Sequence, residues 1–233
     1  MARALAALVL AAAIGSASAA SAPAAGRADA SVFGGLGTWV DIYDSAVYAA
    51  PERAAQRMAA RGIDVVWVET ANFGAAVDVV EPVRLGRLVD ALEERGVRTV
   101  AWYLPGHVNP QLDRRRAVAM LSFRTPRGAA FDAVALNIES TRLRNAALRS
   151  QRAVTLARQL RQAAGETPVA IVPFNPRGLE RRPATWPRFP WKELAAQADA
   201  FAPMVYTGGA FRGFDATYGY VTRALRLLRA HTR

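Results

Sequence analysis

The sequence predicts an α/β fold in which parallel strands alternate with helices and close into a βα barrel. Short apolar segments alternate with amphipathic segments along the chain. Several of the apolar segments are hydrophobic on both faces, as expected for parallel strands covered on two sides. The strand starts recur about every 30 residues, the length of one strand–helix unit. Regular units of this size favour a barrel over an open sheet.

The composition limits the size of the hydrophobic core and the chemical groups that a site can use. The chain has 233 residues, of which 52% are hydrophobic, and it contains no cysteine. This is enough apolar material for one large core, and it excludes disulfides, thiol nucleophiles and cysteine-ligated zinc. The two histidines, His107 and His231, lie in an expected loop and near the C-terminus, and we expect His107 to be solvated. We therefore predict no metal and no cofactor.

The N-terminal residues resemble an export signal. Arg3 precedes an apolar run from Leu5 to Ile14, and Ala17-Ser18-Ala19 is a suitable cleavage site. We predict a signal peptide at 1–19, a small-residue tether at 20–31, and an incomplete barrel domain at 32–233. The alternative is an uncleaved anchor, but the apolar run is shorter than the ~20 residues that span a membrane. We expect a secreted, extracellular or cell-wall-associated protein with no transmembrane span after signal cleavage.

The strands and helices follow in order from residue 36. The expected strands are 36–43, 63–69, 97–104, 131–139, 168–173 and 199–206. Helices are expected between them, with prolines at the first helical position (Pro51, Pro82, Pro110) and glycines just past the last (Gly62, Gly96, Gly165).

The competing architecture is an open, doubly wound sheet. Such a nucleotide-binding sheet needs a glycine-rich loop after its first strand, but here Asp44-Ser45-Ala46-Val47 follows. We therefore predict a TIM-barrel-like (β/α) repeat. About six of its eight units are present before Arg233. The expectation is an incomplete barrel or a truncated relative of a longer protein.

Glu139 is the main catalytic candidate. Strand alternation places Ala133, Ala135, Asn137 and Glu139 on one face of the strand 131–139. Active sites of βα barrels lie at the carboxyl ends of the strands, where Glu139 would sit above Asn137. Partial burial there raises a carboxyl pKa, as a general acid requires. The alternative is an ion pair with a nearby arginine such as Arg142 or Arg144.

Two further carboxylates are candidates for the second acid of a glycosidase pair. Asp41 shares a predicted strand face with Trp39, and Glu69 ends the strand that contains Trp67. For Asp41 the alternative is a buried hydrogen-bonding residue that joins neighbouring strands.

Aromatic residues gather at the same strand ends. Flat aromatic faces with polar rims stack on sugar rings, although core packing explains many strand aromatics. The candidates for substrate binding are Trp39, Trp67, Trp102 and Tyr206. Trp186 and Trp191 lie in or beside the proline-rich stretch 183–190, and we expect this loop to overhang the cleft.

Three segments resemble known glycosidases. Residues 131–139 are similar to the fourth-strand motif of chitinase-type glycoside hydrolases, which ends in D-x-E. Residues 203–206, Pro-Met-Val-Tyr, resemble the Met-x-Tyr signature of their sixth strand. Residues 36–43 resemble the start of uncharacterised, glycosidase-like barrels from secreted actinobacterial proteins. The resemblance implies that Glu139 is the acid and that Met204 and Tyr206 help to hold the sugar.

The resemblance is incomplete at one position. Asn137 stands where the family pattern has aspartate, and the earlier positions are Ala133 and Ala135. An amide hydrogen-bonds but does not balance a developing positive charge. The sequence therefore leaves two functions open: hydrolysis of a glycosidic bond, and non-catalytic binding of carbohydrate or the cell envelope by an inactive relative.

The basic charge indicates which partners to expect. The net charge is +11, and 29 of the 30 basic residues are arginine, since Lys192 is the only lysine. The arginines are spread over separate predicted helices, which argues against nucleic-acid binding. We expect a polysaccharide or oligosaccharide partner and attraction to an anionic cell envelope.

Overall fold

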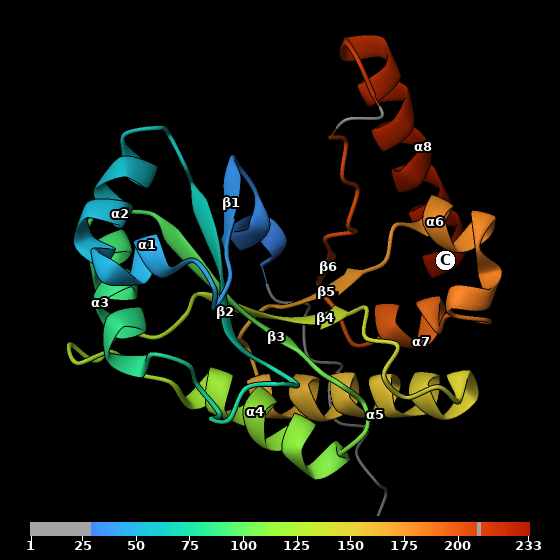
Figure 1. The fold of residues 1–233 in the computed structure, drawn as a ribbon, viewed down its shortest axis with the longest axis horizontal. Helices are drawn as coiled ribbons and strands as arrows, with labels where there is room; N and C mark the ends of the chain where they lie inside the picture. The colour runs from blue at the N-terminus through green and yellow to red at the C-terminus, as the bar shows by residue number, and fades with distance from the viewer. Residues whose placement is uncertain (1–28, 209–210) are drawn as a thin grey trace, which may run out of the picture.

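The six strands form one parallel sheet that curls into a half-barrel (Figure 1). The computed structural model describes residues 29–208 and 211–233. The strands are β1 (Gly37–Val40), β2 (Val65–Asn72), β3 (Arg98–Leu104), β4 (Ala133–Ile138), β5 (Val169–Pro173) and β6 (Ala200–Phe201). They lie in chain order, each hydrogen-bonded to the next, which is the order expected of consecutive strand–helix units. The α/β class and the parallel sheet are confirmed.

Helices cover the convex face of the sheet (Figure 1). They are α1 (Ser45–Ala49), α2 (Pro51–Ala59), α3 (Pro82–Glu93), α4 (Pro110–Ser122), α5 (Ala146–Ala164), α6 (Pro176–Arg181), α7 (Trp191–Ala195) and α8 (Phe214–Thr232), with 3-10 turns η1 (Ala30–Phe33) and η2 (Pro183–Thr185). The predicted helix boundaries are confirmed. Pro51, Pro82 and Pro110 begin α2, α3 and α4, and the glycines that follow helices, such as Gly62 and Gly96, have positive φ angles of 70° and 68°.

The strand ends differ from the prediction. β2 continues to Asn72, so Glu69 lies within the strand and does not end it, and the expected strands 36–43 and 199–206 are the most shortened. β1 ends at Val40, because the Asp44 carboxylate accepts the N–H of Asp41 at 2.9 Å and turns the chain. Asp41 therefore lies in a turn, not within a strand. β6 has only two residues, and 202–207 are irregular. The N–H groups of Ala202 and Met204 still donate to the carbonyls of Ile171 and Pro173 at 2.9 and 3.1 Å, but the segment does not continue as a regular strand.

The concave face is packed by large residues opposite small ones. Trp67 on β2 and Trp102 on β3 face Ala133, Ala135 and Ala170 on β4 and β5, and all five are buried. The side chains of the two tryptophans occupy the space that the alanines leave. This interdigitation fills the lower part of the half-barrel and leaves its carboxyl end for a pocket.

The segment before β1 closes the other end of the half-barrel. Phe33 of η1 stacks on Trp67 with ring centroids 5.6 Å apart. Arg98 donates to the carbonyls of Ser31 and Gly34 at 2.6 and 2.7 Å. Residues 30 and 31, predicted as part of the tether, thus belong to η1. The predicted signal peptide, 1–19, lies outside the described residues, as does the tether before residue 29.

Two loop predictions are wrong. Trp186 and Trp191 are only 1% and 9% exposed, and both pack on Phe189, so they do not overhang a cleft. His107 is also buried, at 1% exposure, and its ring lies edge-on to Trp186. Burial lowers the pKa of His107 to about 4, so this histidine is neutral rather than solvated and charged. These aromatic rings fill the space between the helices that follow β4 and β5.

Candidate functional site

A pocket of about 560 Å³ opens at the carboxyl ends of the strands. It is lined by Trp39, Asp41, Trp102, Asn137, Glu139, Val172 and residues 202–206. The predicted site residues thus converge from β1, β3, β4 and the segment after β6. Glu69 and Trp67, also predicted, do not line this pocket but lie beside or beneath its lining residues.

The aromatic platform (Trp39, Trp67 and Trp102) forms one wall. Trp39 is 45% exposed and stacks on Trp67 at a centroid distance of 4.7 Å and an interplanar angle of 22°. Trp102 meets Trp39 edge-on at 5.7 Å. Parallel register places Trp39 beside Trp67, so the buried ring supports the exposed one. The platform offers a flat apolar surface with a fixed orientation, of the kind on which sugar rings stack.

Glu139 follows β4 directly and is half-buried. The Asn137 side chain donates a hydrogen bond of 3.1 Å to its Oε1. Burial raises the pKa of Glu139, and the Asn137 hydrogen bond opposes this effect. The alternative of an ion pair with Arg142 or Arg144 is not observed within the described residues. Within the described residues, burial and the Asn137 hydrogen bond therefore determine the pKa of Glu139, and no ion pair lowers it.

Glu69 is a buried carboxyl group next to the pocket. It is 2% exposed and accepts the N–H of Ile42 at 3.1 Å. Burial raises its pKa to about 7, hydrogen bonds from Ile42 and Asn72 lower it, and the charges of Asp41 and Glu139 raise it further. The three predicted carboxylates are therefore close enough to interact. Because Glu69 holds the backbone beside Asp41, its geometry is that of a positioning residue.

Asp41 is held at the edge of the pocket by its own turn. Its Oδ1 accepts the N–H of Tyr43 at 2.7 Å, and its N–H donates to Asp44. The hydroxyl of Tyr43 accepts a hydrogen bond from the Asn72 side chain at 3.1 Å. These bonds fix the turn while Asp41 remains partly exposed to the pocket. The second carboxylate of the pocket is therefore positioned by a local turn and not by strand alternation.

The opposite wall is the irregular segment after β6. Its backbone continues to bond to β5, since the N–H of Met204 donates to the carbonyl of Pro173 at 3.1 Å. Met204 lines the pocket, and Tyr206 lies at its rim with 78% exposure. Partial desolvation and the Glu139 carboxylate raise the pKa of Tyr206, so its hydroxyl remains a neutral donor beside Glu139. The predicted meeting of Asn137, Glu139 and Tyr206 at one mouth is thus observed.

Two buried polar atoms beside the pocket have no partner among the described residues. They are Oδ1 of Asn137, an acceptor, and Nε1 of Trp102, a donor. Unpaired buried polar atoms are costly in a folded protein. Since both residues line the pocket, a ligand with hydroxyl or amide groups has an acceptor and a donor to pair with.

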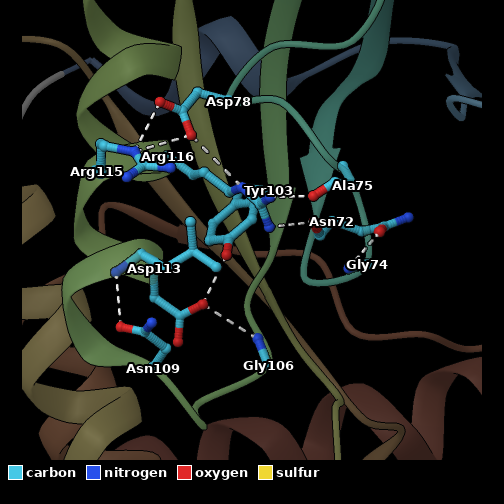
Figure 2. A network of polar contacts seen from close by, with 11 residues as sticks. Asn72, Gly74, Ala75, Asp78, Tyr103, Gly106, Asn109, Asp113, Arg115 and Arg116 are labelled. Atoms are coloured by element: carbon cyan, nitrogen blue, oxygen red, sulfur yellow. Dashed lines mark hydrogen bonds and ion pairs between the residues drawn. The ribbon is translucent and has the colours of Figure 1, made fainter.

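Sequence reasoning missed the residues that hold the loops after β2 and β3 (Figure 2). Arg116 of α4 donates to the carbonyl of Asn72 at 2.7 Å and to that of Ala75. Asp113 of α4 accepts the Tyr103 hydroxyl at 2.6 Å. The available signal was a polar residue on the buried face of a predicted helix. Within the described residues, no group of His, Asp or Glu is arranged to hold a metal ion.

Comparisons with known proteins do not place the chain in a family. No model of a known protein family matches the sequence, and no curated protein matches it. Among the described helices, none is both long and apolar enough to cross a bilayer.

Proposed function

We propose that the protein is a glycoside-hydrolase-like enzyme that acts on a glycosidic bond of a cell-wall or extracellular polysaccharide. The half-barrel is then part of a TIM-barrel-type scaffold related to the chitinase-type hydrolases. A secreted or cell-wall-associated location suits such a substrate. The net charge of +11 favours attraction to an anionic envelope, an effect that salt would weaken.

The observation that carries the proposal is the position of Glu139. It is a half-buried carboxyl group with a raised pKa in the same pocket as Trp39 and Trp102. A sugar ring that stacks on the platform would bring its glycosidic oxygen toward this group. Proton donors of glycosidases require this combination of a protonated carboxyl group and an adjacent sugar subsite.

In the proposed reaction Glu139 gives its proton to the leaving glycosidic oxygen as the bond to the anomeric carbon breaks. Water supplies the new hydroxyl at that carbon and loses its proton to the Glu139 carboxylate, which restores the acid. Asp41, which lines the pocket, balances the positive charge that develops on the sugar ring. Glu69 holds the turn that carries Asp41 through its bond with Ile42, and Tyr206 donates a hydrogen bond to the sugar or to the reaction intermediate.

A second function is carbohydrate binding without hydrolysis. The observation that favours it is Asn137, an amide in the position beside the acid. The amide stabilises a bound hydroxyl but not a cation. In this case the aromatic platform, and not Glu139, determines affinity.

The test compares Glu139→Gln with Glu180→Gln, an exposed charge-matched control on α6. Both are assayed with the wild type for release of reducing ends from chitin- and peptidoglycan-derived oligosaccharides. We expect Glu139→Gln to lose about a hundredfold or more of the rate, as removal of a general acid does, and Glu180→Gln to retain it. An unchanged rate in Glu139→Gln overturns the role of Glu139. If wild type cleaves nothing but binds, and Trp39→Ala weakens binding, the second function holds.

A further inference from the structure

A second groove begins at Glu139. The arginine groove, of about 680 Å³, is lined by Phe73, Leu104, Val108, Glu139, Ser140, Thr141, Arg142 and Arg144. Glu139 is the residue that its lining shares with the pocket at the aromatic platform. A glycan chain whose reacting bond lies at Glu139 would therefore extend into both.

The groove contains an unbalanced positive charge. Arg142 and Arg144 are exposed, and neither forms an ion pair with any residue in 29–208 or 211–233. Some exposed arginines elsewhere have partners, as in the pair of Arg87 with Glu52 at 2.6 Å, whereas others, such as Arg114 and Arg158, form no ion pair with any described residue. At the rim, Arg152 donates to the carbonyl of Val108 at 2.9 Å and adds a third positive charge. Glu139 is the single acidic side chain in the groove lining.

Arg142 is oriented by an aromatic ring. Its guanidinium lies 4.8 Å from the centroid of the Phe73 ring. The N–H of Phe73 donates to the carbonyl of Leu104 at 2.9 Å, which ties this residue to β3. Gly106 allows the close approach, because a Cβ at this position would lie 2.8 Å from the Cβ of Phe73. A guanidinium stacked by its face keeps its N–H edge available for an oxyanion.

Side chains of α4 hold the two loops that flank the groove, and Figure 2 shows their contacts with Asn72, Ala75 and Gly106. Arg116, 3% exposed, holds the carbonyls of Asn72 and Ala75 on either side of Phe73. Asp113 accepts the N–H of Gly106 at 3.3 Å and that of His107 at 2.9 Å. Both loops are therefore held in place without a ligand, which lowers the cost of binding one.

We propose that the arginine groove binds an anionic sugar residue, so that the glycan acted on at Glu139 carries negative charge beside the reacting bond. The inference rests on the proposed function for the role of Glu139 but is tested by binding alone. The planar N–H edge of arginine pairs with two oxygens of one anion, which a carboxylate or a phosphodiester provides. The pocket on the other side of Glu139 takes a neutral, stacked sugar.

The experiment measures binding by calorimetry with all variants in the Glu139→Gln background, where no acid is present to cleave the probe. The probes are a hyaluronan hexasaccharide, in which carboxylated sugars alternate with N-acetylglucosamine, the neutral chitin hexasaccharide, and an oligomer of glycerol phosphate. Arg142→Gln/Arg144→Gln is compared with Arg158→Gln/Arg226→Gln. The control changes net charge equally but on exposed faces of α5 and α8.

We expect an anionic probe to bind about tenfold more tightly than the chitin hexasaccharide, and the Arg142/Arg144 variant to lose this preference. Loss of binding for hyaluronan supports a carboxylated sugar residue in the groove. Loss for glycerol phosphate alone shows an anion site that does not recognise a sugar, and it overturns the proposal. Equal binding of charged and neutral probes, or equal loss in the Arg158/Arg226 control, overturns the proposal. If the protein proves not to hydrolyse glycans, the binding result can still be interpreted, because none of these measurements depends on turnover.

Discussion

The pH dependence of stability provides a sharp test of the buried carboxyl group of Glu69. Burial raises its pKa from 4.5 to about 7, and the bond from Ile42 only partly opposes this. A pKa that is higher in the folded than in the unfolded state stabilises the protein below pH 4.5. This stabilisation is lost as the pH rises through about 7, because the folded protein must then ionise a buried group.

The magnitude follows from the two pKa values. Each unit of pKa shift corresponds to about 1.4 kcal/mol. The rise in the pKa of Glu69 from 4.5 to about 7 therefore corresponds to ~3 kcal/mol of unfolding free energy. Glu69→Gln replaces the acid with a neutral amide whose oxygen still accepts the Ile42 N–H. The variant should match wild type near pH 4.5 and exceed its unfolding free energy by up to ~3 kcal/mol above about pH 8.

The assay is urea denaturation of wild type and Glu69→Gln at several pH values across this range. Glu180→Gln is the control, since it removes a glutamate that is exposed on α6. A difference between Glu69→Gln and wild type that stays constant with pH would refute the argument. The argument would also be refuted if the unfolding free energy of Glu180→Gln varied with pH in the same way as that of Glu69→Gln.

Three further outcomes are expected. Trp39→Ala should weaken binding of a stacked oligosaccharide by about three- to tenfold in calorimetry, because it removes the exposed ring of the platform, and an unchanged affinity would contradict this. Gly35→Ala should lower the unfolding free energy by about 1–3 kcal/mol in urea denaturation, since φ is 99° there and a Cβ would lie 2.5 Å from Oδ2 of Asp64. The control is Gly178→Ala on α6, where a Cβ would make only an ordinary contact of 3.8 Å with the Cβ of Asn175. Asn137→Asp should raise the pKa of Glu139, followed by carboxyl NMR, because a second carboxylate would replace the amide that now donates to it; a fall would count against the assigned geometry.

The fold was largely predictable because its signals are local. Apolar strands with no polar face require cover on both sides, and Pro51, Pro82 and Pro110 mark helix starts whatever surrounds them. Strand ends were less predictable. Asp41 and Tyr206 continue an apolar, alternating pattern. However, the Asp44 carboxylate accepts the N–H of Asp41 and turns the chain after Val40, and the regular part of β6 ends at Phe201.

The candidate site was predictable where strand alternation determines direction. Asn137 and Glu139 follow from one strand and its period, and they lie together in the pocket. The arginine groove was not predictable in this way. Phe73 and Arg142 come from loops after different strands, and their contact depends on the close approach that Gly106 permits.

Local pattern alone determined the parallel strand–helix series, the residues that begin and follow its helices, and the position of Asn137 and Glu139 at the carboxyl end of β4. Tertiary structure decided which carboxyl groups are exposed: Asp41 and Glu139 line the pocket, whereas Glu69 is buried beside it. The reason is physical. Helix caps and strand period depend on neighbours within a few residues. Burial, pKa and the sharing of Glu139 between two grooves depend on how far the sheet curls and which loops meet above it.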